Sequence, residues 1–217
     1  MQLFGGDESG LMVPILGVAL ILTAFVINLQ GNRLIQGFAG FIGFGYYKEN
    51  KLQQEVNTSE AYQNVVELSS GEEKAYLAAG EKFINENGES SYSALTALAL
   101  AKEAASHKDW AQVATYLTTA QEKATNPGMK AIATLRLARV QIELAQYDNA
   151  LATLAATLPA SFNASVEETK GDAYLKQDKV DLARNAYQAA IDASEEAASP
   201  ALQMKLDDLA QHIVLTK

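Results

Sequence analysis

Residues 171–191 read GDAYLKQDKVDLARNAYQAAI, and this stretch decides the fold. Small residues and tyrosines occupy fixed offsets within it, at Gly171, Tyr174, Ala183, Tyr187 and Ala190. Residues three or four apart share one face of a helix, and a small residue on such a face lets a second helix approach closely. The stretch therefore predicts two helices that pack together as a hairpin.

Two stretches upstream repeat this arrangement: LAKEAASHKDWAQVATYL begins at residue 100, and LARVQIELAQYDNALATL begins at residue 137. The paired small positions, in chain order, are Ala101 with Val113, Ala138 with Ala150, and Gly171 with Ala183. Bulky residues stand at the three expected helix–helix turns, namely Trp110, Tyr147 and Val180. The second small positions are 37 and then 33 residues apart, which brackets the tetratricopeptide period of about 34.

The repeat predicts an all-α fold in which stacked helical hairpins form a tetratricopeptide-like superhelix with a concave face. Good helix formers (Ala, Leu, Glu, Lys and Gln) dominate after residue 50. We expect helices over about residues 50–69, 71–87, 91–106, 109–125, 128–145, 147–158, 165–177, 179–197 and 200–214. A helical bundle without repeats is the alternative, because the glycine and aromatic pattern is complete only in the last hairpin.

Local signals set the expected ends of several helices. Ser70–Glu73 and Ser165–Glu168 each match the capping box, in which a serine and a glutamate satisfy the first backbone N–H groups of a helix. Gly88 follows a helical run and is expected to end it. The segment 126–128, Asn-Pro-Gly, predicts a turn, and the pair 199–200, Ser-Pro, predicts a capped helix start.

The N-terminal part predicts a membrane anchor over residues 1–47, ahead of a soluble tetratricopeptide-like domain over residues 48–217. Residues 11–29 carry no charge, and a helix of that length at about 1.5 Å per residue approaches the roughly 30 Å hydrocarbon layer. A cleaved signal peptide is disfavoured because the first ten residues contain no Lys or Arg. Residues 34–47, LIQGFAGFIGFGYY, are a second apolar stretch. Its small residues either let another transmembrane helix approach closely or simply reflect the ordinary composition of membrane helices.

Charge leaves the number of membrane spans and the orientation open. If both stretches cross, Arg33 marks the turn between them as cytoplasmic, and the large domain lies outside. If only the first stretch crosses, Arg33, Lys48 and Lys51 all lie on the domain side, which points the domain into the cytoplasm. If only the second stretch crosses, basic residues flank both of its ends.

The composition argues against several functions. The net charge is −9, and an acidic chain repels phosphate backbones, so nucleic acid is not expected as a partner. Cysteine is absent, and the two histidines, His107 and His212, lie far apart in the sequence. The carboxylate pairs Glu195-Glu196 and Asp207-Asp208 point to different faces of their helices. We therefore predict no enzyme activity, no catalytic residue, no metal site and no cofactor.

Six blocks share their order and spacing with a known family. They are GFGYYKENKLQQEV, AAGEKFINEN, SSYSALTALALAKEA, MKAIATLRLARVQIELAQYDNAL, GDAYLKQDKVDLARNAYQAA and ALQMKLDDL. Together they resemble, over about residues 31–213, the bacterial inner-membrane ancillary subunit of the SecYEG translocon. The most specific block is LRLARVQ at residues 135–141.

The resemblance implies a Gram-negative inner-membrane protein with residues 34–47 as its transmembrane helix and its repeat domain in the periplasm. It implies association with SecYEG, with a membrane-anchored periplasmic prolyl-isomerase-like chaperone and with newly translocated envelope proteins. Residues 1–30 depart from the family, which usually begins with a charged cytoplasmic segment.

From these observations we expect a non-catalytic scaffold that associates with the SecYEG translocon and binds other proteins through its repeat domain. The alternative is a membrane-tethered regulatory adaptor that sequesters a soluble signalling protein, which requires a cytoplasmic domain. Neither hypothesis identifies partner-binding residues.

Overall fold

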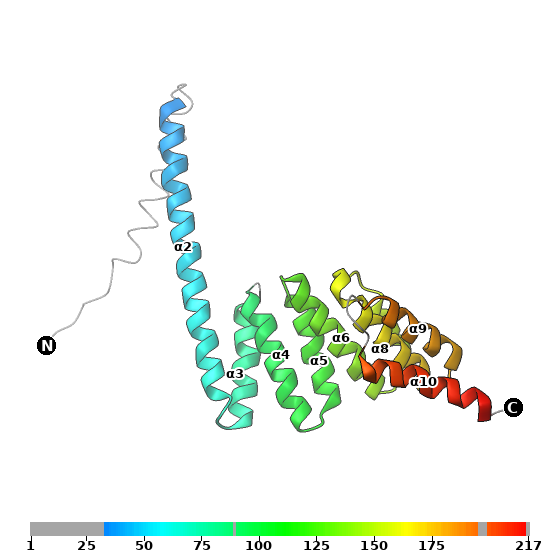
Figure 1. Ribbon diagram of the computed structural model, residues 1–217. Helices are drawn as coiled ribbons and strands as arrows, with labels where there is room; N and C mark the ends of the chain where they lie inside the picture. The colour runs from blue at the N-terminus through cyan, green and yellow to red at the C-terminus, as the bar shows by residue number, and fades with distance from the viewer. Residues whose placement is uncertain (1–32, 89, 195–198, 216–217) are drawn as a thin grey trace. The chain divides into compact units, whose positions relative to one another are not determined.

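The computed structural model describes residues 33–88, 90–194 and 199–215, with side chains over residues 44–88, 90–194 and 199–209. Helices joined by short turns make up these residues, without a strand among them, which confirms the predicted all-α class. The chain separates into two compact units, residues 1–60 and residues 61–217. The elements in Figure 1 are α2 (Arg33–Leu68), α3 (Glu73–Glu86), α4 (Ser91–Ser106), α5 (Trp110–Lys123), α6 (Pro127–Glu143), α7 (Tyr147–Leu154), η1 (Ala160–Phe162), α8 (Asn163–Lys176), α9 (Val180–Asp192) and α10 (Pro200–Leu215).

Helix α2 runs without interruption from the second apolar stretch through the residues that were expected to open the repeat domain. Within the described part of the chain, no helix has an apolar run long enough to cross a membrane. The first predicted span, residues 11–29, lies outside the described residues. The anchor over residues 1–47 and its boundary with residues 48–217 therefore stay predictions.

The unit of residues 61–217 contains the three predicted hairpins. Helix α4 packs on α5, α6 on α7, and α8 on α9. Neighbouring hairpins stack because α5 also packs on α6, and both α6 and α7 pack on α8. Helix α3 lies against α4 at one end of the stack and α10 against α9 at the other (Figure 1). Each hairpin thus covers apolar surface of the next, as in helical repeat proteins.

The small residues that defined the repeat are buried, as predicted. All six paired positions, Ala101, Val113, Ala138, Ala150, Gly171 and Ala183, lie in the core. The bulky residues Trp110, Tyr147 and Val180 are the first residues of α5, α7 and α9, and each packs half-buried against the apolar cluster of its own hairpin. Small side chains therefore set the close approach within each hairpin, and large ones fill the space at its turn.

Each hairpin turns through a residue in the left-handed region. These residues are Lys108, Ala145 and Asp178, with φ of 60°, 58° and 58°. In each turn the following N–H reaches back five residues to a helix carbonyl, at 3.1, 2.8 and 3.0 Å respectively, which closes the C-terminus of the first helix. No glycine stands at these turns, so the sequence predicted their positions but not their conformation.

Two predicted helix starts are wrong. Ser70 does not cap α3, whose cap is Glu72, and the Ser70 hydroxyl instead donates to the Glu67 carbonyl at 3.3 Å. Ser165 lies inside α8, because η1 leads directly into that helix and starts it earlier than the serine. Gly88 directly follows Asn87, the cap residue of α3, so its predicted place at the helix end is confirmed, although it is not in the left-handed conformation. A capping motif is local, and here the packing of the preceding segment decides where the helix starts.

Two predicted helix starts are confirmed. The Asn126 side-chain oxygen accepts a hydrogen bond from the Gly128 N–H at 2.8 Å, which caps α6 ahead of its proline. The Ser199 hydroxyl oxygen accepts from the Leu202 N–H at 3.2 Å at the start of α10.

The third hairpin uses a different pair of residues at its crossing from the other two. A Cβ added at Gly171 would overlap the ring of Tyr187, which is fully buried. At the position of Tyr187 the first two hairpins have Leu117 and Leu154, each 2% exposed, and at the position of Gly171 they have alanine. Glycine with tyrosine and alanine with leucine are therefore two ways of filling one crossing.

Because glycine occurs with tyrosine and alanine with leucine, substitutions at Gly171 and Tyr187 should affect stability in a coupled way. Gly171→Ala should lower the free energy of unfolding by about 1–3 kcal/mol despite the better helix propensity of alanine, because the ring cannot move out of a packed core. Gly171→Ala combined with Tyr187→Leu copies the other hairpins and should lose less than the sum of the two single changes. Denaturant unfolding of the four proteins measures this coupling, and strictly additive losses would contradict it.

Candidate protein-binding surface

The first helices of the second and third hairpins present side chains to solvent. Beyond its first turn, α6 exposes only Ile132, Arg136, Arg139 and Glu143, and its other residues are half-buried or buried. These four residues lie on one face, since they follow helical spacing. Helix α8, which packs on α6, has Leu175 and Lys176 exposed at its end. We call the four residues of α6 the α6 stripe.

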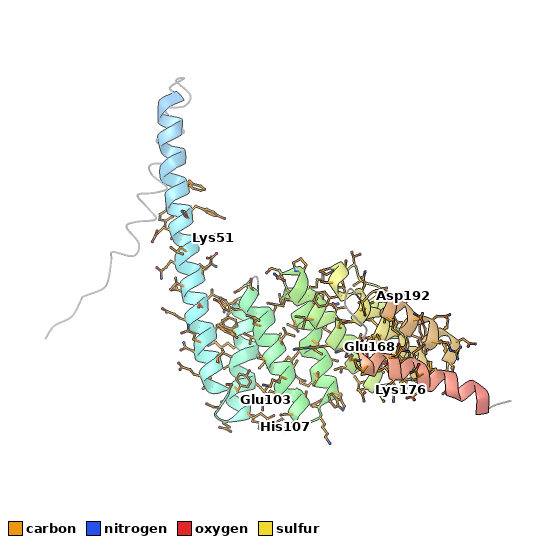
Figure 2. All side chains as sticks on the ribbon, viewed as in Figure 1. Lys51, Glu103, His107, Glu168, Lys176 and Asp192 are labelled. Carbon is orange, nitrogen blue, oxygen red and sulfur yellow. The ribbon has the colours of Figure 1, made fainter. Side chains whose placement is uncertain are left out.

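The acidic side chains of α8 already have a partner within the chain. Lys205 of α10 places Nζ at 2.8 Å from Glu168 Oε1 and at 2.8 and 3.0 Å from the two carboxylate oxygens of Asp172. The Tyr187 hydroxyl of α9 donates to Asp172 Oδ1 at 2.8 Å. Figure 2 labels Glu168 within the group of helices α8, α9 and α10. The cluster joins three helices and closes the C-terminal end of the stack.

Charge and burial change how this cluster titrates. Burial alone lowers the pKa of Lys205, but the hydrogen bonds and charges of Asp172 and Glu168 outweigh it, so the net shift is upward. Burial raises the pKa of the Tyr187 hydroxyl, and the bonded carboxylate of Asp172 raises it further. In the first hairpin, burial and the hydrogen bond to Glu81 raise the pKa of Tyr116 to about 12.

The tyrosine shifts predict loss of stability in alkali. The folded state keeps these hydroxyls protonated above pH 10, where the unfolded chain releases their protons, so stability falls as pH rises from about 10 towards the folded pKa. Each tyrosine contributes a slope of about 1 kcal/mol per pH unit in that range. Tyr187→Phe should cost about 1 kcal/mol at neutral pH through the lost hydrogen bond and should flatten the alkaline slope. Urea unfolding at pH 7 to 11.5 checks this, and an unchanged slope would contradict it.

Within the part of the chain that the structure describes, the groups that the sequence flagged for chemistry do not assemble into a catalytic or metal site. His107 Nε2 lies 3.3 Å from Glu73 Oε2 and 3.5 Å from Glu103 Oε1, but its side chain is half exposed at the turn after α4, where Figure 2 shows it beside Glu103. Asp207 and Asp208 are both exposed. Among the described residues, no group of three His, Cys, Asp or Glu could hold a metal ion. The pair 195–196 and the side chain of residue 212 lie outside the described residues.

A second polar region lies where the turns of the second and third hairpins meet. Gln146, Tyr147 and Lys179 line an open depression there, together with Asp148 and Gln177. Gln177 Nε2 donates to Asp148 Oδ1 at 3.3 Å, while its Oε1 is buried without a hydrogen-bond partner in the part of the chain that the structure describes. The depression could accept one donor group from a ligand but carries no nucleophile or metal ligand set.

Comparison with known proteins shows first to which class of fold this chain belongs. Residues 28–211 match the family described as "Tetratricopeptide repeat-like domain". Two solved structures have the same fold. "MamA RS-1 ArsTM double mutant" has a TM-score of 0.54 at 18% identity, covering 71% of this chain and 84% of that chain. "MamA 41-end from Desulfovibrio magneticus RS-1" has a TM-score of 0.51 at 18% identity, covering 72% and 92%. The helical stack of residues 61–217 thus has the predicted tetratricopeptide-like superhelical fold.

Curated relatives narrow the class to a family. The protein named "Ancillary SecYEG translocon subunit" in Escherichia coli (strain K12) is 32% identical over 81% of this chain and 85% of its own length. The protein of the same name in Haemophilus influenzae is 30% identical over 81% and 86%, and that in Neisseria gonorrhoeae is 27% identical over 81% and 86%. This chain therefore belongs to the family of ancillary SecYEG translocon subunits, which confirms the resemblance. A family of ancillary subunits with this fold is a non-catalytic scaffold type, in agreement with the prediction that the chain is not an enzyme.

Proposed function

We propose that this protein is a non-catalytic scaffold that associates with the SecYEG translocon in the bacterial inner membrane. The observation that supports this most strongly is the similarity to the translocon subunits along about four fifths of the chain. A stack of helical hairpins offers a long surface on which other proteins can bind, which suits a scaffold.

The partners bound by the repeat domain belong to this proposal. We propose that it binds a membrane-anchored periplasmic prolyl-isomerase-like chaperone and newly translocated envelope proteins. The acidic charge of the chain favours protein partners over nucleic acid or anionic lipid headgroups. The translocon places client proteins and chaperones at one location, and a scaffold tethered there raises their effective concentration towards each other.

We also propose that residues 1–47 anchor the chain in the inner membrane and that the repeat domain lies on the periplasmic side. The apolar sequences of residues 11–29 and 34–47 support the anchor. A periplasmic domain follows if both stretches cross with Arg33 at the cytoplasmic turn.

Two experiments test the proposal. Tagged full-length protein, extracted from membranes in a mild detergent, should co-purify with SecYEG, whereas an unrelated inner-membrane protein of equal abundance should not. Alkaline phosphatase fused after Lys217 should be active, and a cytoplasmic fluorescent reporter at the same site should not be. Absence of SecYEG under gentle extraction would overturn the scaffold, and a cytoplasmic C-terminus would favour a regulatory adaptor instead.

A further inference from the structure

A basic segment interrupts the acidic chain. Between Glu122 and Glu143 the sequence contains no Asp or Glu but has Lys123, Lys130, Arg136 and Arg139, in a chain whose net charge is −9. Two of the four arginines of the chain fall here, both in the block LRLARVQ at residues 135–141. Both arginines are exposed, whereas the other residues of that block are buried or half-buried, so packing of the stack accounts for those residues but not for the two cations.

The two arginines lie together on the α6 stripe and are not used inside the chain. Arg136 and Arg139 are exposed three residues apart, with the exposed Ile132 one turn before them. Within the described residues, neither guanidinium has a carboxylate oxygen within 4.0 Å. Arg184, by contrast, pairs with Asp181 at 2.8 Å, just as Lys205 pairs with the acidic side chains of α8. Of the three arginines whose side chains the structure describes, Arg184 is paired with a carboxylate, and Arg136 and Arg139 are not.

Two exposed arginines at this spacing are suited to bind carboxylate groups. Its planar guanidinium donates two parallel hydrogen bonds to a carboxylate and is more weakly hydrated than an ammonium group. Side chains three apart on a helix have Cβ atoms about 5–6 Å apart. Two carboxylates at a similar separation, on one face of a helix or on one side of an extended segment, could engage both arginines at once.

We propose that Ile132, Arg136 and Arg139 bind an acidic segment of a partner protein, in which two carboxylates pair with the arginines and an apolar side chain packs on Ile132. The inference rests on the proposed role of the repeat domain in binding proteins, and it does not depend on SecYEG being the partner. A phospholipid surface fits less well, because the remainder of this acidic chain repels an extended anionic surface, whereas a short segment meets only the local positive potential.

A defined peptide panel tests the proposal. The probes are fluorescein-labelled 14-residue peptides with two Glu residues two, three or four apart beside a Leu, and the same peptides with Gln in place of Glu. Fluorescence polarisation with the full-length protein in mild detergent should show binding of an acidic peptide at least tenfold tighter than that of its Gln counterpart. The difference should shrink as salt is raised from 50 to 300 mM, because exposed charges are screened.

Substitutions in the α6 stripe, compared with a control pair on α3, test whether the acidic peptide binds at the two arginines. Arg136→Glu with Arg139→Glu should reduce the affinity for the acidic peptide at least tenfold, and Lys at both positions should give an intermediate loss because bidentate pairing is lost while charge is kept. Lys74→Glu with Lys82→Glu makes the same change in net charge at exposed positions of α3 and should have little effect. Circular dichroism melting should show that all three variants fold.

Three outcomes would overturn the inference: equal binding of the Glu and Gln peptides, an equal loss in the α3 control, or unchanged affinity in the Arg136 and Arg139 variant. Vesicles containing anionic phosphatidylglycerol form a separate arm. Capture of the protein by these vesicles through the two arginines, without a preference for acidic peptides, would assign the stripe to lipid instead. Each of these results is separate from co-purification with SecYEG, so the inference and the proposed function can fail independently.

Discussion

The structure depends on how closely two helices can approach within each hairpin. An alanine or glycine in the first helix of each hairpin is buried at the crossing, and at Gly171 the absence of a side chain leaves room for the ring of Tyr187. This approach buries the leucines and tyrosines beside the crossing, such as Leu117 and Tyr187. Because each hairpin leaves apolar surface that only its neighbour covers, the three crossings together sustain the stack.

The C-terminal end shows how a repeat array stops. Helix α10 occupies the place where another hairpin would begin, and it is held by charge as well as by apolar contact: Leu202 and Leu209 are buried, while Lys205 reaches the carboxylates of α8. The acidic side chains of the third hairpin are therefore engaged within the chain. The arginines of the second hairpin remain free for a partner from outside, within the part of the chain that the structure describes.

Sequence reasoning found the repeat because small residues at a fixed period report directly on helix crossings. It placed Trp110, Tyr147 and Val180 correctly at the hairpin turns. It failed at Ser70 and Ser165, because a capping motif also occurs where tertiary packing starts the helix elsewhere. It could not find the α6 stripe, since exposure is a property of the assembled stack. The lack of acidic residues from 123 to 142 is nevertheless visible in the sequence and marks this segment as basic.

The central claim is that the small residues at the crossings hold the stack together. Hydrogen exchange of Ala150→Leu, compared with Ala152→Leu on the exposed side of α7, tests it most directly. Overpacking the crossing should cost about 1–3 kcal/mol and remove amide protection mainly in α6, α7 and the adjoining α8, while α4 stays protected. The Ala152 variant should exchange like the parent. Equal protection of α6 and α7 in both variants would contradict the claim.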